Sequence, residues 1–453
     1  MLMMDGSLYR LVSRRQARGH LFHGCAVAHN APVSTNRSTS RNIRGLWWHG
    51  FWLAASLTFT EFNTVLPSLI LDAGGAEIHI GVLTAIMIGV PLLAQLGFAG
   101  YLHGRDRKKP YLMLGIHLRV LALAGAATTI GITRSADTAV VIGLLYVWML
   151  LFSMSGAFAG ISYTDITGRA VPSEQRRRFF VLKQTFAGVG VLGAALAGRT
   201  LLARFDYPTE YQLMFFAAAG ALLVATVGFW TLREPSGSEA DPTKSRPRYW
   251  QVMGSIPRML KADRTLRLYI LASNLVGLGI TLVPFYVSLA RTRIGLGSDQ
   301  VGTLLLVQIV AMVASNALWS HVAKRRGFKG VIRWLILIAA SGPPLALLLA
   351  TGPFAPFFPL IFLLSGSAHS ADHIAGDAVI IEISNEQNRA LYSGVFGTLN
   401  LTRAAFPVAS GALLAALGYE AVFIAVAVTA LSALPLLRGM VCPVDRAPSG
   451  TAD

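Results

Sequence analysis

Charged residues are scarce in this chain. They make up 13% of its 453 residues, whereas hydrophobic residues make up 54%; an average soluble protein has about a quarter charged residues. The scarcity extends along the whole chain, which excludes a soluble protein with one membrane anchor. Alternating segments of about ten residues do not dominate either, and this excludes a transmembrane β-barrel.

Cysteines and catalytic motifs are also scarce. The two cysteines, Cys25 and Cys442, fall in segments predicted to be cytosolic, so we expect free thiols and no disulfide. The sequence has no HExxH, GxSxG, phosphate-binding loop or Cys/His dyad. We therefore expect neither an enzyme nor an ATP-driven pump, and no cofactor.

What the chain has in abundance is long apolar blocks. A helix needs about 20 apolar residues to cross a bilayer, and twelve blocks of roughly that size are present, several with the Gly or Pro that membrane helices tolerate. The sequence therefore predicts an all-α polytopic membrane protein. The blocks are 47–70, 79–101, 110–132, 137–161, 179–200, 209–231, 267–290, 299–320, 330–350, 354–378, 391–415 and 418–438.

The net charge of +17 is distributed unevenly between the loops. With the N-terminus inside, 30 of the 39 Lys and Arg residues fall on the inner side and 5 on the other. This asymmetry predicts a protein of the inner or plasma membrane with both termini in the cytoplasm. The same asymmetry places the basic residues beside the anionic lipids of the inner leaflet. This accounts for the high positive charge, so we expect no nucleic-acid partner.

A repeat divides the chain into two halves. Residues 153–177 align with residues 365–389, and identities include Asp165 with Asp377, Glu174 with Glu386, and Arg177 with Arg389. Parallel repeats of six helices are typical of duplicated transporters. The predicted organisation is a disordered basic tail (1–45), a six-helix bundle (46–232), a cytosolic linker with an amphipathic helix on the inner leaflet (233–265,), a second six-helix bundle (266–441) and a cytosolic tail (442–453).

With these features the chain resembles the major facilitator superfamily (MFS). The resemblance covers about 46–440 and includes the basic loops after the second and eighth helices. Against the family pattern G-x-x-x-D-R-x-G-R-K, the first loop matches at Gly100, Arg105, Lys108 and Lys109, and the second at Arg325, Gly327 and Lys329. In the two loops Gly104 and Lys324 stand where the pattern has Asp, and Arg107 stands at its second Gly.

The resemblance implies a solute carrier with two pseudo-symmetric bundles that work by alternating access. It also implies a cytosolic gate, in which carboxylates at the ends of the fourth and tenth helices meet basic residues and separate on opening. A simple helix-end cap is the alternative interpretation. The predicted gate residues are Arg105, Lys109, Asp165, Glu174, Arg177, Arg325, Lys329, Asp377, Glu386 and Arg389.

Ionisable residues within the bilayer are costly and are functional candidates by default. Helical spacing places Thr58, Glu61, Thr64 and Ser68 on one stripe of the first helix. Glu61 is then either a cavity-facing carboxylate that binds a proton or a cationic group, or a residue that only bonds between helices. Weaker candidates for cavity-lining residues are single polar residues, which more often join helices by hydrogen bonds: Asn274, Thr281, Tyr286, Gln308, Asn316, Asn400 and Thr402.

The tenth helix carries the most unusual polar group. His369, Asp372 and His373 lie at i, i+3 and i+4 and so face the same way. This patch could bind substrate or a proton, hold a metal ion, or only join helices by hydrogen bonds. Arg403 of the eleventh helix lies at a similar height, which predicts an ion pair with Asp372.

Together these features predict a monomeric secondary transporter that moves a small solute, with a proton as a candidate coupling ion. Glu61, His369, Asp372, His373 and Arg403 are its predicted substrate or proton residues. The alternatives are a receptor or assembly protein that keeps the fold without transporting, and a carrier of metal ions that uses the His/Asp patch.

Overall fold

The computed structural model describes residues 37–103, 105, 107–132, 136–234, 249–384, 389–400 and 402–440, and the described residues form helices and no strand. The predicted tails before position 37 and after position 440, and most of the linker (235–248), lie outside the described residues. The helices of the first half are α1 (Arg37–Phe59), α2 (Val65–Asp72), α3 (Glu77–His103), α4 (Lys109–Gly131), α5 (Thr138–Ala170), η1 (Ser173–Gln175), α6 (Arg176–Arg204) and α7 (Thr209–Trp230).

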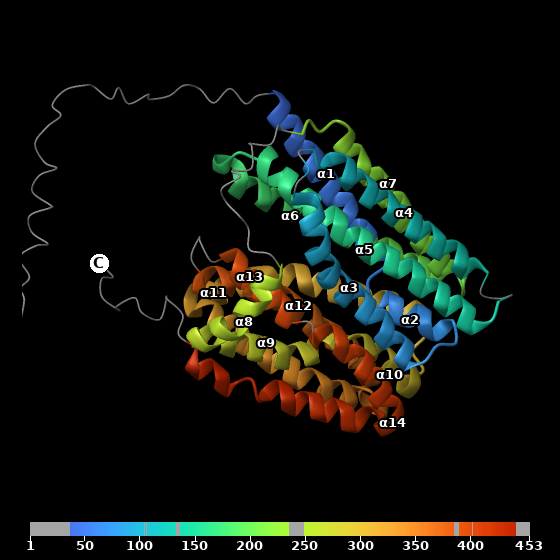
Figure 1. The fold of residues 1–453 in the computed structure, drawn as a ribbon. Coiled ribbons are helices and arrows are strands. Elements are labelled where there is room, and N and C mark those ends of the chain that lie inside the picture. Colours follow the sequence, from blue (N-terminus) through green and yellow to red (C-terminus); the bar gives the residue numbers. More distant parts are fainter. Residues whose placement is uncertain are drawn as a thin grey trace, which may run out of the picture. The chain divides into compact units, whose positions relative to one another are not determined.

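The second half follows the helix of the linker, α8 (Tyr249–Ala262). Figure 1 shows the blue to green helices of the first half lying together, and the yellow to red helices of the second half lying together. The helices of the second half are α9 (Arg264–Thr281), α10 (Pro284–Ile294), α11 (Ser298–Leu349), η2 (Gly352–Phe357), α12 (Pro359–Ile383), α13 (Arg389–Leu399), α14 (Thr402–Leu431) and η3 (Pro435–Gly439).

Among the described residues, eight stretches are long and apolar enough to cross a membrane by length and composition. Two of them, α11 and α14, each contain a glycine with a positive φ, Gly327 (63°) and Gly418 (80°), at which one helix ends and the next begins. The broken first helix (α1 and α2) and α12 complete the twelve predicted crossings. The polytopic all-α fold is therefore confirmed.

Local sequence sets where several helices begin. The Asp137 carboxylate accepts a hydrogen bond from the backbone N–H of Ala139 (2.7 Å) at the start of α5, and Asp263 does the same for Leu266 (2.9 Å) at the start of α9. Such caps satisfy N–H groups that have no partner within the helix. Proline stands in the first turn of α4, α10 and α12, where its missing N–H costs nothing.

One predicted boundary and one predicted contact differ from the structure. The first helix begins at Arg37, so the predicted limit between tail and bundle at position 45 falls inside α1. This extension is held by Asn42, whose side chain exchanges hydrogen bonds of 2.9 and 3.0 Å with the backbone of Arg233. In the linker helix α8, Ile256 is buried and Met259 and Leu260 pack against the second half, so these apolar residues contact protein where the sequence suggested lipid.

The two halves share a hydrophobic core at one end only. We call the end that holds Asp72 and Arg291 the outer end, and the end that holds Lys108 and Lys329 the inner end, after the sides that the charge distribution predicts. One buried cluster joins the first half to residues 282–309, 346–362 and 414–426, the outer parts of the second half. A separate cluster contains the inner parts of the second half and α8, so the halves are packed together at the outer end.

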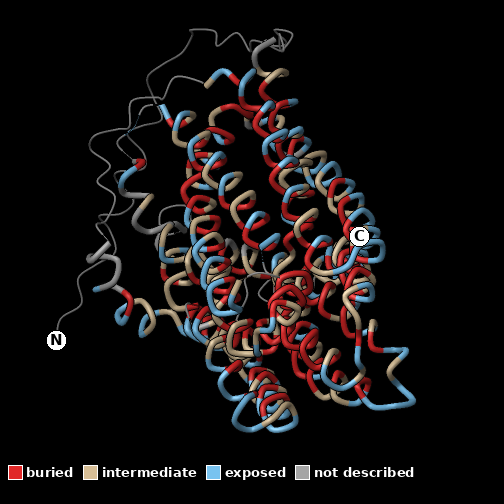
Figure 2. Tube along the Cα trace, turned by 90° about the vertical axis from the view of Figure 1, so that its right-hand side faces the viewer, coloured by how far each residue is buried: buried red, intermediate tan, exposed pale blue. Residues whose placement is uncertain are grey.

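Large apolar side chains are exposed along the outward helix faces. On α5, Val140 is 54% exposed and Val147 57%; Leu144 and Met154 are also exposed. In Figure 2 the buried residues lie mainly where helices face each other. Contiguous exposed apolar surface marks a binding face in a soluble protein; on helices of this length it is the surface expected to meet lipid.

Candidate functional site

The His/Asp patch lies on α12, as the sequence predicts. The ring centroids of His369 and His373 are 5.0 Å apart. His369 also lies 6.3 Å from the ring of Phe62, which belongs to the first half. His373 is exposed. The patch therefore extends from the contact between the halves to an accessible surface.

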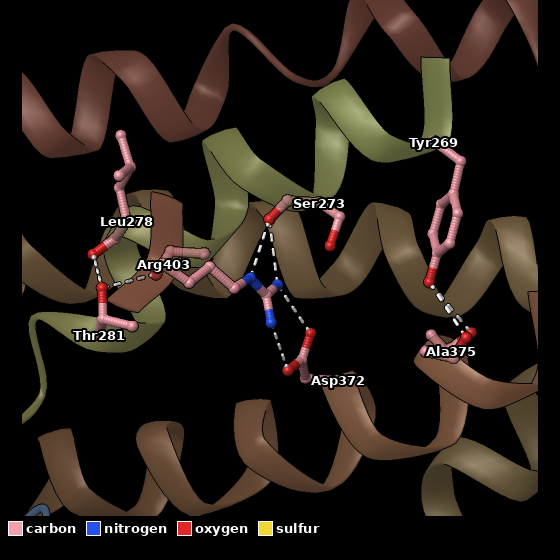
Figure 3. Close-up of polar contacts among 9 residues, drawn as sticks. Tyr269, Ser273, Leu278, Thr281, Asp372, Ala375 and Arg403 are labelled. Atoms are coloured by element: carbon pink, nitrogen blue, oxygen red, sulfur yellow. Dashed lines mark hydrogen bonds and ion pairs between the residues drawn. The ribbon is translucent and has the colours of Figure 1, made fainter. Parts of the chain in front are cut away.

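The predicted ion pair between Asp372 and Arg403 is present. Both guanidinium Nη atoms donate to the Asp372 carboxylate at 3.0 Å, and Nε and Nη2 also donate to the backbone carbonyl of Ser273 at 3.2 and 3.0 Å. Figure 3 shows Arg403 held between Ser273 and Asp372. One guanidinium thus connects α9, α12 and α14, and paired charges of this kind are the form in which ions persist at membrane depth.

Gly277 makes room for this arginine. A Cβ atom at position 277 would lie 2.6 Å from Arg403 Cγ and 2.8 Å from its Cδ. Those distances are too short for contact between carbon atoms. The glycine on α9 therefore allows the arginine stem to pass close to the helix backbone.

A small cavity of about 20 Å³ lies beside the patch. It is lined by His369, by Gln308 and Tyr286 of the second half, and by Asn63 of the first half. A volume of this size holds about one water molecule.

The cavity lies where two equivalent helices are interrupted. The first helix breaks between α1 and α2, and the seventh breaks between α9 and α10, just before Pro284. Asn63 of the first break and Val283 of the second both line the cavity. Interrupted helices in corresponding positions of two repeats commonly mark the substrate site of a transporter.

Glu61 forms part of the first of these breaks, which corrects the prediction of a continuous helical stripe. Its Oε2 accepts hydrogen bonds from the N–H groups of Asn63 (2.8 Å) and Thr64 (2.9 Å), and its Oε1 accepts from the Asn63 side-chain amide (2.7 Å). The carboxylate satisfies backbone groups that the helix break leaves without partners. Glu61 therefore shapes the segment that carries Asn63 into the cavity.

The described residues contain no group of three His, Cys, Asp or Glu side chains placed to hold a metal ion. Both Asp372 oxygens are bonded to Arg403. The predicted alternative of a metal site on α12 is therefore not supported by the geometry around His369 and His373.

The outer end contains a polar network that sequence reasoning missed. Arg291 of α10 pairs with the Asp72 carboxylate at 2.6 and 2.8 Å and also donates to the Ser68 hydroxyl. The Tyr211 hydroxyl donates to Asp72 at 2.7 Å. Nearby, Glu77 accepts hydrogen bonds from Ser288 (2.8 Å) and Tyr419 (2.7 Å) of the second half. We call the contacts of Asp72 with Arg291, and of Glu77 with Ser288 and Tyr419, the outer lock.

At the inner end, Asp165 forms ion pairs inside the first half. Its Oδ2 lies 3.1 Å from Lys108 Nζ and 2.6 Å from Arg169 Nη2. The carboxylate therefore does meet the basic loop, but through Lys108. Of the two loop residues that were predicted, Arg105 lies 5.2 Å from the Tyr101 ring centroid and Lys109 donates to the Leu232 carbonyl at 2.7 Å.

The other predicted gate residues are less fully placed. Lys329 Nζ donates to the carbonyl of Met440 at 3.0 Å, and the Glu174 and Arg325 side chains are exposed. Glu386 lies outside the described residues, as do the side chains of Arg177, Asp377 and Arg389.

Two halves of membrane-spanning helices, with a cavity at their contact that several polar side chains help to line, define a membrane transporter, which is not an enzyme. Residues 100–442 match the sequence model of the family described as MFS/sugar transport protein. This match covers well over half of the chain, so the chain belongs to that family. A search of curated proteins finds none that matches the chain.

Solved structures share the fold at low sequence identity. A mutant of the nucleoside transporter NupG has a TM-score of 0.66 at 14% identity, covering 89% of this chain and 99% of that one. A POT family transporter in complex with a thioalcohol-conjugated peptide has a TM-score of 0.65 at 12% identity, covering 88% and 96%. A bacterial homologue of the iron transporter ferroportin, in an inward-facing state, has 0.63 at 13%, covering 88% and 98%.

Proposed function

We propose that this protein is a secondary transporter that moves a small solute by alternating access. The observation that carries the proposal is the outer lock, which joins the halves at one end, next to a cavity that residues of both halves line. Release of the lock would let the halves rock and expose the cavity to the other side. The inward-facing state of the similar ferroportin homologue is consistent with this interpretation.

The proposed solute or proton site is the α12 patch with its partners. His369, Asp372, His373 and Arg403 supply titratable and charged groups next to the cavity. Glu61 contributes by fixing the helix break that holds Asn63. A histidine can change its charge near neutral pH, so a proton is a reasonable coupling ion for this site.

The remaining assignments follow from the charge distribution. We propose that the chain is a monomer in the inner membrane, with both termini in the cytoplasm and the basic inner end against anionic lipid. We also propose that Asp165 and Asp377, with the basic residues named above, form the cytosolic gate. In the present state Asp165 pairs with Lys108 and Arg169 of its own half, so under this proposal these ion pairs do not connect the two halves.

A receptor or assembly protein with the same fold is the alternative. Transport is the better-supported function, because such a protein would need neither the charged pair beside the cavity nor a lock between its halves. The two functions are distinguished by measuring solute uptake into vesicles that contain the purified chain, and the pH inside the same vesicles reports whether protons move with the solute. Candidate solutes are first selected by thermal shift among sugars, amino acids, nucleosides, peptides and metal ions.

Replacing His373 with alanine is expected to abolish transport of the solute selected in that way. The side chain is exposed, so its loss should change stability by no more than about 0.5 kcal/mol, and the protein should remain folded in the membrane. Uptake into vesicles measures the effect. His321→Ala, which removes another exposed histidine of the second half, is the matched control. Wild-type uptake by the His373 variant would rule out this residue as part of the site.

A further inference from the structure

A second, larger cavity lies at the inner end, away from the site described above. Its volume is about 540 Å³, within the range of sites that bind small ligands. It is formed between the part of α11 from Arg326 to Leu337 and the last helical segment, around η3.

The cavity is strongly cationic. Arg326, Lys329 and Arg333 line it from α11, and Arg438 lines it from η3. None of the described residues that line it is acidic. The three arginines are exposed, and none has a hydrogen bond or ion pair with another described residue. Four basic side chains around one cavity favour a ligand that carries negative charge.

The cavity also has an apolar part. Trp334 and Leu337 follow the basic residues on the same face of α11, and Leu434 and Leu437 face them from the last segment. Trp334 is 44% exposed. A tryptophan at this position, between basic residues and leucines, is typical of the boundary between headgroups and acyl chains.

On both walls of the cavity, α11 and the last helical segment, the basic residues lie nearer the inner end than the leucines. Lys329 Nζ donates to the carbonyl of Met440 at 3.0 Å, which places the start of one wall beside the end of the other. The basic residues therefore gather at the inner end, and the leucines lie deeper in the bilayer. The helix that begins after Gly327 also directs its first backbone N–H groups toward this end, which favours an anion.

We propose that this cavity binds an anionic phospholipid of the inner leaflet. The headgroup phosphate lies between Arg326, Arg333 and Arg438, and an acyl chain lies along Trp334 and Leu337. Basic pockets between membrane helices on the cytoplasmic side recognise such headgroups. A soluble phosphorylated compound would satisfy the arginines but leave the apolar wall uncovered, so the lipid is the better match.

The test is a titration of the purified full chain in neutral detergent, with bound ligand counted by native mass spectrometry. Phosphatidylglycerol is the probe, phosphatidylcholine with the same acyl chains controls for the headgroup, and glycerol 3-phosphate controls for a soluble source. Arg333→Gln/Arg438→Gln should weaken phosphatidylglycerol binding about 25-fold, since each basic residue near anionic lipid contributes on the order of a fivefold factor in affinity. Arg258→Gln/Lys261→Gln, which removes the same charge from exposed positions of α8, should leave it unchanged.

A second variant, Trp334→Ser, leaves every charge in place. It should weaken phosphatidylglycerol binding and leave the much weaker binding of glycerol 3-phosphate as it was. Equal lipid affinity in the arginine variant and its α8 control would overturn the site. Phosphatidylcholine or glycerol 3-phosphate binding as tightly as phosphatidylglycerol would overturn the assignment to an anionic lipid.

Discussion

Replacing Arg291 with alanine is expected to open the outer end of the protein. Arg291 forms a bidentate pair with Asp72, and both side chains are largely shielded, with 18% and 16% of their surface exposed. The pair joins α10 of the second half to α2 of the first. Its loss removes a direct connection between the halves at the end where they share a core.

The size of the effect follows from the chemistry of the pair. Each hydrogen bond to a charged group contributes about 1.5–3 kcal/mol. The variant loses two such bonds to Asp72, but the Asp72 carboxylate keeps the hydrogen bond from Tyr211, so the net loss is smaller than the sum of the two. A loss of about 1.5–3 kcal/mol from one state changes the ratio of the two states on the order of ten- to a hundredfold. The closed state would then no longer dominate.

The opening can be measured as a distance between spin labels at the outer end. With Cys25 and Cys442 changed to serine, labels at Val140 and Phe354, exposed positions of the two halves, report the separation. Arg293→Ala is the matched control. Arg293 lies two residues further along and pairs with Glu420 inside the second half, where the side chains are 45% and 61% exposed, so its pair contributes little. Identical distance distributions for both variants would show that Arg291 does not lock the outer end.

The outer lock and the α12 patch differ in how far the sequence could predict them. Asp372 and Arg403 lie on consecutive helices, so counting residues from the helix ends was enough to place them side by side. Asp72 and Arg291 are separated by most of the first half and the linker, and their contact depends on how the two halves pack. The only sequence signal is that each comes directly after the first apolar block of its half, 47–70 and 267–290.

Helix interruptions were the other limit of sequence reasoning. The twelve crossings could be predicted because apolar blocks are long and continuous through such breaks. Hydropathy does not register that Glu61 bonds to the backbone of Asn63 and Thr64, or that Pro284 restarts the seventh helix. Similarly, Lys108 and not Lys109 meets Asp165, because the register of α4 decides which neighbour faces inward.

The interruptions and the lock together suggest how the cavity is controlled. The short helices α2 and α10 carry Asp72 and Arg291 at one end, and they begin beside Asn63 and Val283, which line the cavity. A movement of either short helix therefore changes the lock and the cavity together. Under the proposed transport function, a solute that contacts the breaks would bias the lock through these rigid segments.

Replacing Arg403 with glutamine is expected to be the most destabilising single change in the site. It removes both hydrogen bonds from the guanidinium to Asp372. The carboxylate, whose side chain is only 27% exposed, is then left without its charged partner. Breaking a buried ion pair from one side costs about 3–5 kcal/mol, and the partial exposure of Asp372 places the expected loss of unfolding free energy near 3 kcal/mol. Asp372→Asn should cost less, because Arg403 keeps its bonds to the Ser273 carbonyl.

The double variant Asp372→Asn/Arg403→Gln, compared with the two single variants, isolates the interaction energy between Asp372 and Arg403 from the contacts that each makes with other residues. Without an unpaired charge it should be more stable than Arg403→Gln alone, which gives a coupling energy of about 0.5–3 kcal/mol. A charge swap is a poorer test, because a carboxylate at position 403 would face the Ser273 carbonyl, which is also an acceptor. Unfolding by SDS in mixed micelles provides the free energies, and Arg267→Gln, an exposed arginine of α9, is the control, with a change below about 0.5 kcal/mol. Strict additivity of the two single changes would mean that Asp372 and Arg403 do not act as a pair.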